Sequence, residues 1–245
     1  MTYHPDWIVP DWPAPANVKS VITTRAGGVS GGPFASFNLG LRTGDDPQAI
    51  AENRARLRGL LPQEPKWLRQ VHGADVVEAD TAMDAPEADA SVARRAGTVC
   101  AVMIADCVPV LLADRAGTQV AIAHAGWRGL AGGVIENTVR KLGAAPGELL
   151  AYLGPGIGPR AFEVGADVRD ALLGRDARAA TAFTPRAAGK WLADLFLLAR
   201  QRLQTAGVDR IYGGGLCTYS DAARFYSYRR DKVTGRMAAL IWRTG

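Results

Sequence analysis

The sequence predicts a fold of the α/β or α+β class with mixed β-sheets. Near-continuous apolar runs, typical of strands buried on both faces, alternate along the chain with segments of helical periodicity. Hydrophobic residues make up 48% of the chain and charged residues 22%, as in ordinary globular proteins. The 245 residues contain no internal repeat and no low-complexity linker, so we expect a single domain over residues 1–245.

Glycine and proline divide the first third of the chain into its expected elements. Pro47 follows Asp46 and suits the first position of a helix, because proline has no backbone N–H to satisfy there. Apolar and polar residues alternate on both sides of Gly73, which indicates a pair of strands. In chain order we expect an extended N-terminal arm (1–17), a strand (18–28), a glycine-rich loop (31–44), a helix (47–61) and a strand pair (66–80).

The rest of the chain interleaves strands with helices. We expect strands in residues 98–106, 118–126, at the start of 149–159, in 210–219 and at the end of 223–242. Helical periodicity predicts helices in residues 129–143, 161–173 and 191–207. Gly143 and Gly207 are expected to end two of them. Residues 175–190, rich in Ala and Arg and interrupted by Pro185, are interpreted as a surface loop or a short helix.

Composition argues against several classes of partner. The net charge is +5, but the arginines are spread along the chain without the basic run of a nucleic-acid-binding arm, so we expect no nucleic-acid partner. The longest apolar stretch, residues 99–113, contains Asp106 and Pro109 and is too short to span a membrane. The first residues lack the pattern of a signal peptide, and 3 cysteines are typical of reduced thiols, so we expect a cytoplasmic protein.

The strongest functional signal comes from two of the 3 histidines and one cysteine. His72, Cys107 and His124 each lie beside or within an apolar, strand-like run. Two imidazoles, a thiolate and one open position form the donor pattern of a catalytic zinc site. The long gaps between them match no short zinc motif, so Cys107 as a buried apolar residue and His72 as an ordinary loop histidine stay open.

The same residues also fit a thiolate nucleophile. Cys107 would then attack a substrate, with His72 or His124 as the base and Asp106 orienting it. A cysteine–histidine pair needs only one imidazole, so the presence of two favours the metal.

Several polar residues in glycine-rich or aromatic surroundings are candidates for binding a substrate. Arginines of this kind can bind a phosphate or carboxylate, Tyr228 can stack on a planar ring, and side-chain amides can bind a base or a sugar. Each is also a common structural residue. The candidates are Arg25, Asn38, Gln70, Arg128, Arg160, Tyr228 and Arg229.

Several ordered motifs resemble the polyphenol oxidase or laccase-domain family, whose members are also described as purine nucleoside phosphorylases and as peptidoglycan editing factor. The motifs, between about residues 18 and 242, are QVHGADV, ADCVPVLLAD, AHAGWRGLAGGV, LGPGIGP, FEVG, CTY, RFYSYRRD and TGRMAALI. The resemblance implies a single-domain catalytic α/β (α+β) sandwich with mixed β-sheets flanked by helices. It also implies zinc held by His72, Cys107 and His124.

For the activity, the resemblance implies phosphorolysis of adenosine, inosine or guanosine, with methylthioadenosine cleavage and adenosine deamination as related reactions. Deamination needs a carboxylate as proton shuttle, and Asp106 is the candidate beside a metal ligand. The alternative is a cytoplasmic amidase that removes a wrong amino acid from a nucleotide-linked muramic acid, a peptidoglycan precursor. A further alternative is a non-enzymatic metal-binding protein. A true multicopper laccase is excluded because 3 histidines cannot supply its copper cluster, although adventitious copper can replace zinc.

Overall fold

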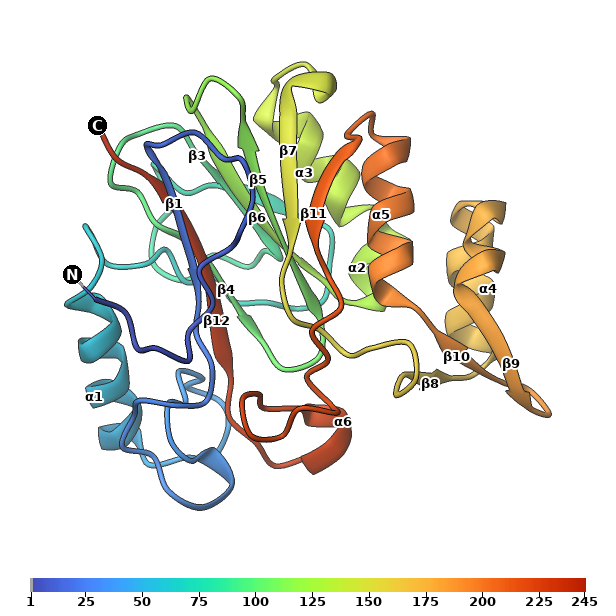
Figure 1. The fold of residues 1–245 in the computed structure, drawn as a ribbon, viewed down its shortest axis with the longest axis horizontal. Helices are drawn as coiled ribbons and strands as arrows, with labels where there is room; N and C mark the ends of the chain where they lie inside the picture. Colours follow the sequence, from blue (N-terminus) through green and yellow to red (C-terminus); the bar gives the residue numbers. More distant parts are fainter. Residues whose placement is uncertain (1) are drawn as a thin grey trace.

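Two β-sheets pack face to face in the computed structural model, which describes residues 2–245 (Figure 1). The larger sheet consists, in spatial order, of β11 (Arg210–Gly213), β7 (Leu149–Leu153), β5 (Val108–Asp114), β6 (Val120–Ala125), β3 (Ala90–Ala93) and β2 (Val76–Glu78). The smaller sheet consists of β1 (Val18–Ile22), β12 (Met237–Arg243) and β4 (Cys100–Ile104). The pairs β11–β7 and β2–β3 are parallel and the other pairs of these sheets are antiparallel, so the larger sheet is mixed.

Helices cover the outer faces of both sheets. The larger sheet is covered by α2 (Trp127–Gly132), α3 (Val134–Leu142) and α5 (Leu195–Thr205), and the smaller sheet by α1 (Pro47–Arg58) (Figure 1). The predicted class, an α/β (α+β) sandwich with mixed sheets flanked by helices, is confirmed. The short helices are η1 (Gly32–Phe34), η2 (Pro146–Glu148) and α6 (Tyr228–Asp231).

The alternation of side chains along β5 explains why this strand is apolar throughout. Val110 and Leu112 face the core under α3 and α5, whereas Leu111 and Ala113 face the core between the two sheets. Successive side chains of a strand point to opposite faces, so a strand between two cores needs apolar residues at every position. Burying each such leucine contributes about 1.5–3 kcal/mol.

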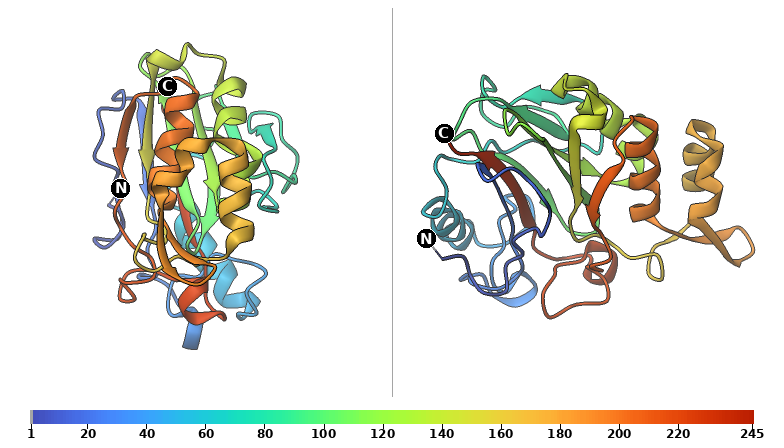
Figure 2. Two further views of the ribbon diagram at one scale, coloured as in Figure 1. Left: turned by 90° about the vertical axis from the view of Figure 1, so that its right-hand side faces the viewer. Right: turned by 45° about the horizontal axis from the view of Figure 1, so that its top comes forward.

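A third, outlying sheet overturns the interpretation of residues 175–190. It consists of β8 (Glu163–Val164), β10 (Lys190–Ala193) and β9 (Phe183–Ala187), and it lies beside α4 (Ala166–Arg175) and η3 (Ala177–Ala182) (Figure 2). The short-helix part of the prediction corresponds to η3, but the expected loop is a β-hairpin. Phe183 and Ala193 are buried in the core beneath it, which the alanine-rich composition concealed.

Two helix predictions were wrong at the N-terminal end. The expected helix 191–207 begins at Leu195, because the Asp194 carboxylate caps it by accepting the Leu197 N–H at 2.9 Å and residues 191–193 belong to β10. The expected helix 161–173 begins at Ala166, after β8. The expected helix 129–143 is two helices, since Gly133 between them adopts a left-handed φ of 89°.

The predicted strand pair 66–80 is mostly irregular. Only Val76–Glu78 forms a strand, β2, and the chain before it is attached by isolated bridges such as Lys66 with Cys100. Strand β3, its parallel neighbour, was not expected, because alanine and serine give a weak strand signal.

At the N-terminus, residues 2–17 contain no helix and no named strand, and Ile8 forms an isolated bridge with Ile22. Within residues 2–245, no helix combines the length and the apolar character needed to cross a membrane.

Candidate metal centre

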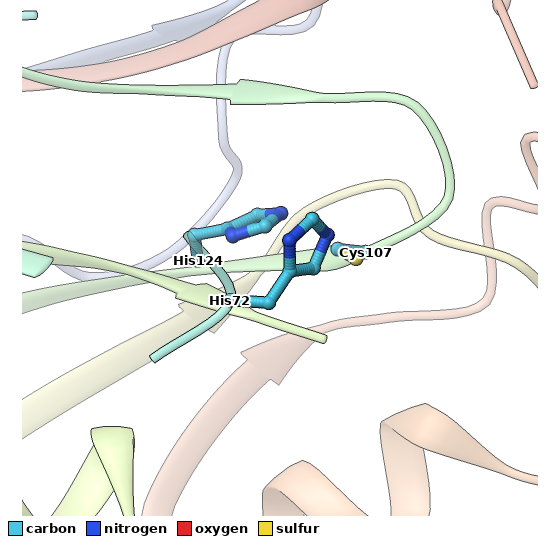
Figure 3. A group of neighbouring side chains, drawn as sticks. All are labelled: His72, Cys107 and His124. Carbon is cyan, nitrogen blue, oxygen red and sulfur yellow. The ribbon is translucent and has the colours of Figure 1, made fainter. Parts of the chain in front are cut away.

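His72, Cys107 and His124 come from three separate segments and meet at one end of the larger sheet. His72 lies in the loop before β2, Cys107 immediately precedes β5, and His124 lies in β6 opposite Pro109 of β5. Their ligand atoms all lie within 4.8 Å of one another, and the side chains converge on a common point (Figure 3). His124 is buried, Cys107 half-buried and His72 exposed, so the group opens to solvent on the His72 side.

Cys107 lies where the chain passes from one sheet to the other. β4 belongs to the smaller sheet and β5 to the larger one, and residues 105–107 form the connection. Gly126 comes two residues after His124 and leaves the space that the sulfur occupies. A Cβ atom at Gly126 would lie 2.6 Å from the Cys107 Sγ and 3.4 Å from the Cδ2 of His72. Glycine is therefore required where β6 leads into α2.

The two histidines stabilise the thiolate form of Cys107. Burial alone raises the pKa of the thiol, but the charge and hydrogen bonds of His124 and His72 outweigh burial and lower this pKa to about 6. Burial lowers the pKa of His124, yet Cys107 and Asp89 outweigh it and raise this pKa to about 9. The thiolate is the form of cysteine that binds metals and attacks electrophiles.

Asp89 is a site residue that the sequence analysis missed. It is fully buried, and its carboxylate accepts hydrogen bonds from the backbone N–H groups of Val71, His72 and Gly73 and lies 2.8 Å from the Nδ1 of His124. Burial raises the pKa of Asp89, but the bond and charge of His124 and the backbone N–H groups lower it below its ordinary value. The available signal was an acidic residue between Ala88 and Ala90, where burial demands partners.

Asp106 holds the C-terminal part of the chain. Its backbone adopts a left-handed φ of 102°, and its side chain is 8% exposed. The carboxylate accepts the Thr218 hydroxyl at 2.7 Å and the Arg229 backbone N–H at 2.6 Å. These bonds place α6, which contains Tyr228 and Arg229, against the segment that contains Cys107.

Three of the predicted substrate-binding residues are bonded within the fold. Arg25 donates to the carbonyl groups of Ala35 and Ala222. Asn38 is fully buried and accepts the backbone N–H groups of Gly40 and Arg236. Gln70 exchanges two hydrogen bonds with the backbone of Met103 in β4.

The other predicted substrate-binding residues are more accessible. Arg128 and Arg160 are exposed, and the Arg128 guanidinium lies over the ring of Trp127. Tyr228 is 52% exposed. The side chain of Arg229 lies over Phe162 and donates to the carbonyl of Glu163.

Arg236, which the sequence analysis also missed, lies next to this group. Its guanidinium is 5.8 Å from the centre of the Tyr228 ring. Burial outweighs the negative charges of Asp106 and Cys107 and lowers the pKa of Arg236 below its ordinary value. Arg236 lies between Gly235 and the start of β12, and a single arginine in such a place is no signal of a functional residue.

Comparison with known proteins supplies a family. The profile of the family described as multi-copper polyphenol oxidoreductase laccase matches residues 19–244. The chain is 56% identical over 237 residues to "Purine nucleoside phosphorylase PA4543" of Pseudomonas aeruginosa, covering 96% of this chain and 98% of that protein. It is 55% identical over 238 residues to "Purine nucleoside phosphorylase YfiH" of Escherichia coli K12, with 96% and 98% covered.

Solved structures agree with this assignment. Protein NMB0706 of Neisseria meningitidis superposes with a TM-score of 0.95 at 53% identity, covering 98% of this chain and 100% of that one. YlmD of Geobacillus stearothermophilus superposes with a TM-score of 0.91 at 34% identity, covering 100% of this chain and 98% of that one. The resemblance of the sequence motifs is thereby confirmed.

Proposed function

The chain belongs to the family described as multi-copper polyphenol oxidoreductase laccase, and from this membership we propose that it is a zinc-dependent purine nucleoside phosphorylase. The proposed substrates are adenosine, inosine or guanosine together with phosphate. Its relatives carry the name purine nucleoside phosphorylase at up to 56% identity. The observation that carries the proposal is the convergence of His72, Cys107 and His124 on one point. We assign the activity to one catalytic domain over residues 1–245.

The donor set fits one zinc ion. Tetrahedral zinc with nitrogen at about 2.0–2.1 Å and sulfur at about 2.3 Å places these three ligand atoms about 3.3–3.6 Å apart. The separations of at most 4.8 Å therefore need only small side-chain rotations to reach this geometry. Copper also binds such a set, and we treat it as an adventitious alternative. With 3 histidines in the chain, a multicopper oxidase cluster lacks the number of imidazole ligands that it needs.

Zinc at this position would act as a Lewis acid and lower the pKa of a bound water. The side chains around it have separate tasks in the proposal. Arg128, Arg160 and Arg229 are proposed to bind phosphate, and Tyr228 to stack on the purine. Arg25, Asn38 and Gln70 were predicted to bind substrate. We propose that they do so indirectly, because their hydrogen bonds hold the segments that would contact it.

In the proposed reaction, the bond between the sugar C1′ and the purine nitrogen breaks while a phosphate oxygen bonds to C1′. The products are the free base and ribose 1-phosphate, and the leaving nitrogen takes up the proton that the attacking hydrogen phosphate gives up. Asp106 is the group proposed to relay this proton. Its two hydrogen bonds leave further lone pairs on the carboxylate. The same carboxylate would serve adenosine deamination as a side activity, and methylthioadenosine cleavage would follow the phosphorolysis chemistry.

One observation favours a second candidate. The pKa of Cys107, lowered to about 6 by His124 and His72 against the effect of burial, also suits a nucleophile. The alternative activity is an amidase that acts on a nucleotide-linked muramic acid precursor of peptidoglycan. The Cys107 thiolate would attack the amide carbonyl, the amine would leave with a proton, and water would hydrolyse the resulting thioester. We propose a cytoplasmic location for either activity, because the cysteines of the described chain, Cys100, Cys107 and Cys217, are all free thiols.

Turnover of inosine and adenosine by metal-quantified protein, with and without phosphate, separates these candidates. The proposal predicts free base and ribose 1-phosphate only when phosphate is present, and loss of both products when zinc is removed. Release of free base without phosphate would indicate hydrolysis. No base release in either condition would favour the amidase. Equal turnover with and without metal would remove zinc from the chemistry.

A further inference from the structure

We propose that Asp89 is the positioning residue that presents both histidines of the centre to the metal. The inference rests on the metal site of the proposed function but not on the reaction catalysed there. A single carboxylate, from the residue just before β3, contacts both histidine segments. Its Oδ1 binds the His72 N–H at 3.0 Å and the His124 ring at 2.8 Å, and its Oδ2 binds the N–H groups of Val71 at 3.0 Å and Gly73 at 2.7 Å.

The first consequence concerns the loop that contains His72. His72 has a left-handed φ of 61°, which is unfavourable for a residue with a Cβ atom. Three consecutive backbone N–H groups around it point at Asp89. A carboxylate that accepts these bonds offsets the cost of the left-handed conformation, and the loop then keeps the exposed His72 beside Cys107 and His124. Without the carboxylate, these three N–H groups would have only water as an acceptor, and the loop would lose its fixed conformation.

The second consequence concerns the ring of His124. Asp89 accepts the Nδ1–H of this ring, so Nε2 is the nitrogen left for Cys107 and the metal. The backbone carbonyl of Asp89 also accepts the His124 N–H at 2.7 Å, which fixes the position of this residue in β6. A carboxylate bonded to the far nitrogen of a histidine ligand orients the ring and raises its basicity. Asp89 therefore acts on His124 through both its side chain and its backbone.

Asp114 provides a matched control. It is also a buried carboxylate, 6% exposed, and it accepts the backbone N–H groups of Thr118 at 2.7 Å and Gln119 at 3.0 Å as well as the Thr118 hydroxyl. It lies at the end of β5 farther from Cys107, so its bonds hold a hairpin and no metal ligand. Asp89→Asn and Asp114→Asn therefore remove comparable backbone bonds at different distances from the centre.

The experiment measures zinc affinity of the metal-free full chain by competition with a chromophoric chelator. We expect Asp89→Asn to weaken zinc binding by about 10- to 100-fold and Asp114→Asn to leave it within twofold of the wild type. Wild-type affinity in Asp89→Asn, or an equal loss in both variants, would overturn the inference. Because affinity is measured without substrate, failure of the phosphorylase assay does not affect this result.

A second measurement needs no variant and decides the matter if Asp89→Asn does not fold. Nitrogen-15 NMR of zinc-loaded wild-type protein resolves the ring nitrogens of only 3 histidines. We expect His124 to carry a proton on Nδ1 that is hydrogen-bonded to a carboxylate, and the metal on Nε2. Metal on Nδ1 of His124, or an Nδ1 proton exchanging freely with water, would overturn the inference. If the wild type binds no zinc, the proposed function fails, and the Nδ1 proton of the metal-free protein still tests Asp89.

Discussion

Asp89 and Asp106 are both buried beside the candidate metal centre, but they hold different parts of the chain. Asp89 binds the backbone of residues 71–73 and the ring of His124, which are the segments of two candidate metal ligands. Asp106 binds Thr218 and the backbone of Arg229, which belong to the C-terminal segment that contains Tyr228. The difference indicates two separable networks, one around the candidate metal ligands and one around the C-terminal segment that is proposed to face the substrate. They adjoin where Asp106 precedes Cys107.

The largest effect should come from removing the ligand at which the two networks meet. Cys107→Ala eliminates the only sulfur donor of the group, so we expect the purified protein to lose its stoichiometric zinc and all phosphate-dependent base release. Metal analysis and chromatography of the products check both. A Cys100→Ala variant, altered at a buried thiol of β4 outside the group, is the control and should keep its zinc. Unchanged zinc content in Cys107→Ala would refute the ligand assignment.

On the Asp106 side, Asp106→Asn should reduce turnover by about 10²-fold or more if the carboxylate transfers a proton. The shape of the side chain and one acceptor oxygen are preserved, so zinc content should equal that of the wild type. Steady-state kinetics on metal-quantified protein measure the effect. Full turnover with zinc bound would remove Asp106 from the proton-transfer step and leave it only the bonds to Thr218 and Arg229.

Tyr228→Ala tests the proposed substrate-facing role of the C-terminal segment that Asp106 holds. A half-exposed aromatic ring that stacks on a purine contributes about 0.5–1.5 kcal/mol beyond its buried area, so KM for inosine should rise about 2- to 10-fold. The value of kcat and the zinc affinity should stay as in the wild type. An unchanged KM would mean that the purine binds elsewhere, whereas a loss of zinc would mean that the two networks are coupled.

The smallest effect on catalysis and zinc binding is expected from Thr218→Val, which removes a hydroxyl donor to Asp106 without changing the volume of the side chain. Loss of one partner from a buried carboxylate costs about 1–3 kcal/mol in the free energy of unfolding, measured by urea denaturation. Zinc affinity should not change. A fall in zinc affinity as large as that expected for Asp89→Asn would show that Asp89 and Asp106 do not act on separate segments.

The candidate metal group could be recognised in the sequence because its residue types are rare. Histidine occurs 3 times and cysteine 3 times, so a cysteine and two histidines beside apolar runs are conspicuous without any alignment. The fold class could be predicted for a different reason. Strands and helices are recognised by hydrophobic periodicity, which is a property of residues that are neighbours in the sequence. The capping Asp194 shows that even the error at the start of α5 had a readable signal.

Asp89 and the hairpin of β9 and β10 could not be predicted in this way. The partners of Asp89 are 16 to 35 positions away in the chain, and three of them are backbone N–H groups, which every sequence contains. The hairpin is specified by the burial of Phe183 and Ala193 against distant helices rather than by a local pattern. Contacts between remote segments outweigh local propensity in both places.

X-ray absorption at the zinc edge, recorded on the zinc-loaded full chain, tests the central claim most directly. One ion held by His72, Cys107 and His124 predicts a single sulfur scatterer at about 2.3 Å and nitrogen or oxygen scatterers at about 2.0–2.1 Å. A spectrum of wild-type protein without a sulfur scatterer would contradict the account, because the metal would then lie outside the group that the fold brings together.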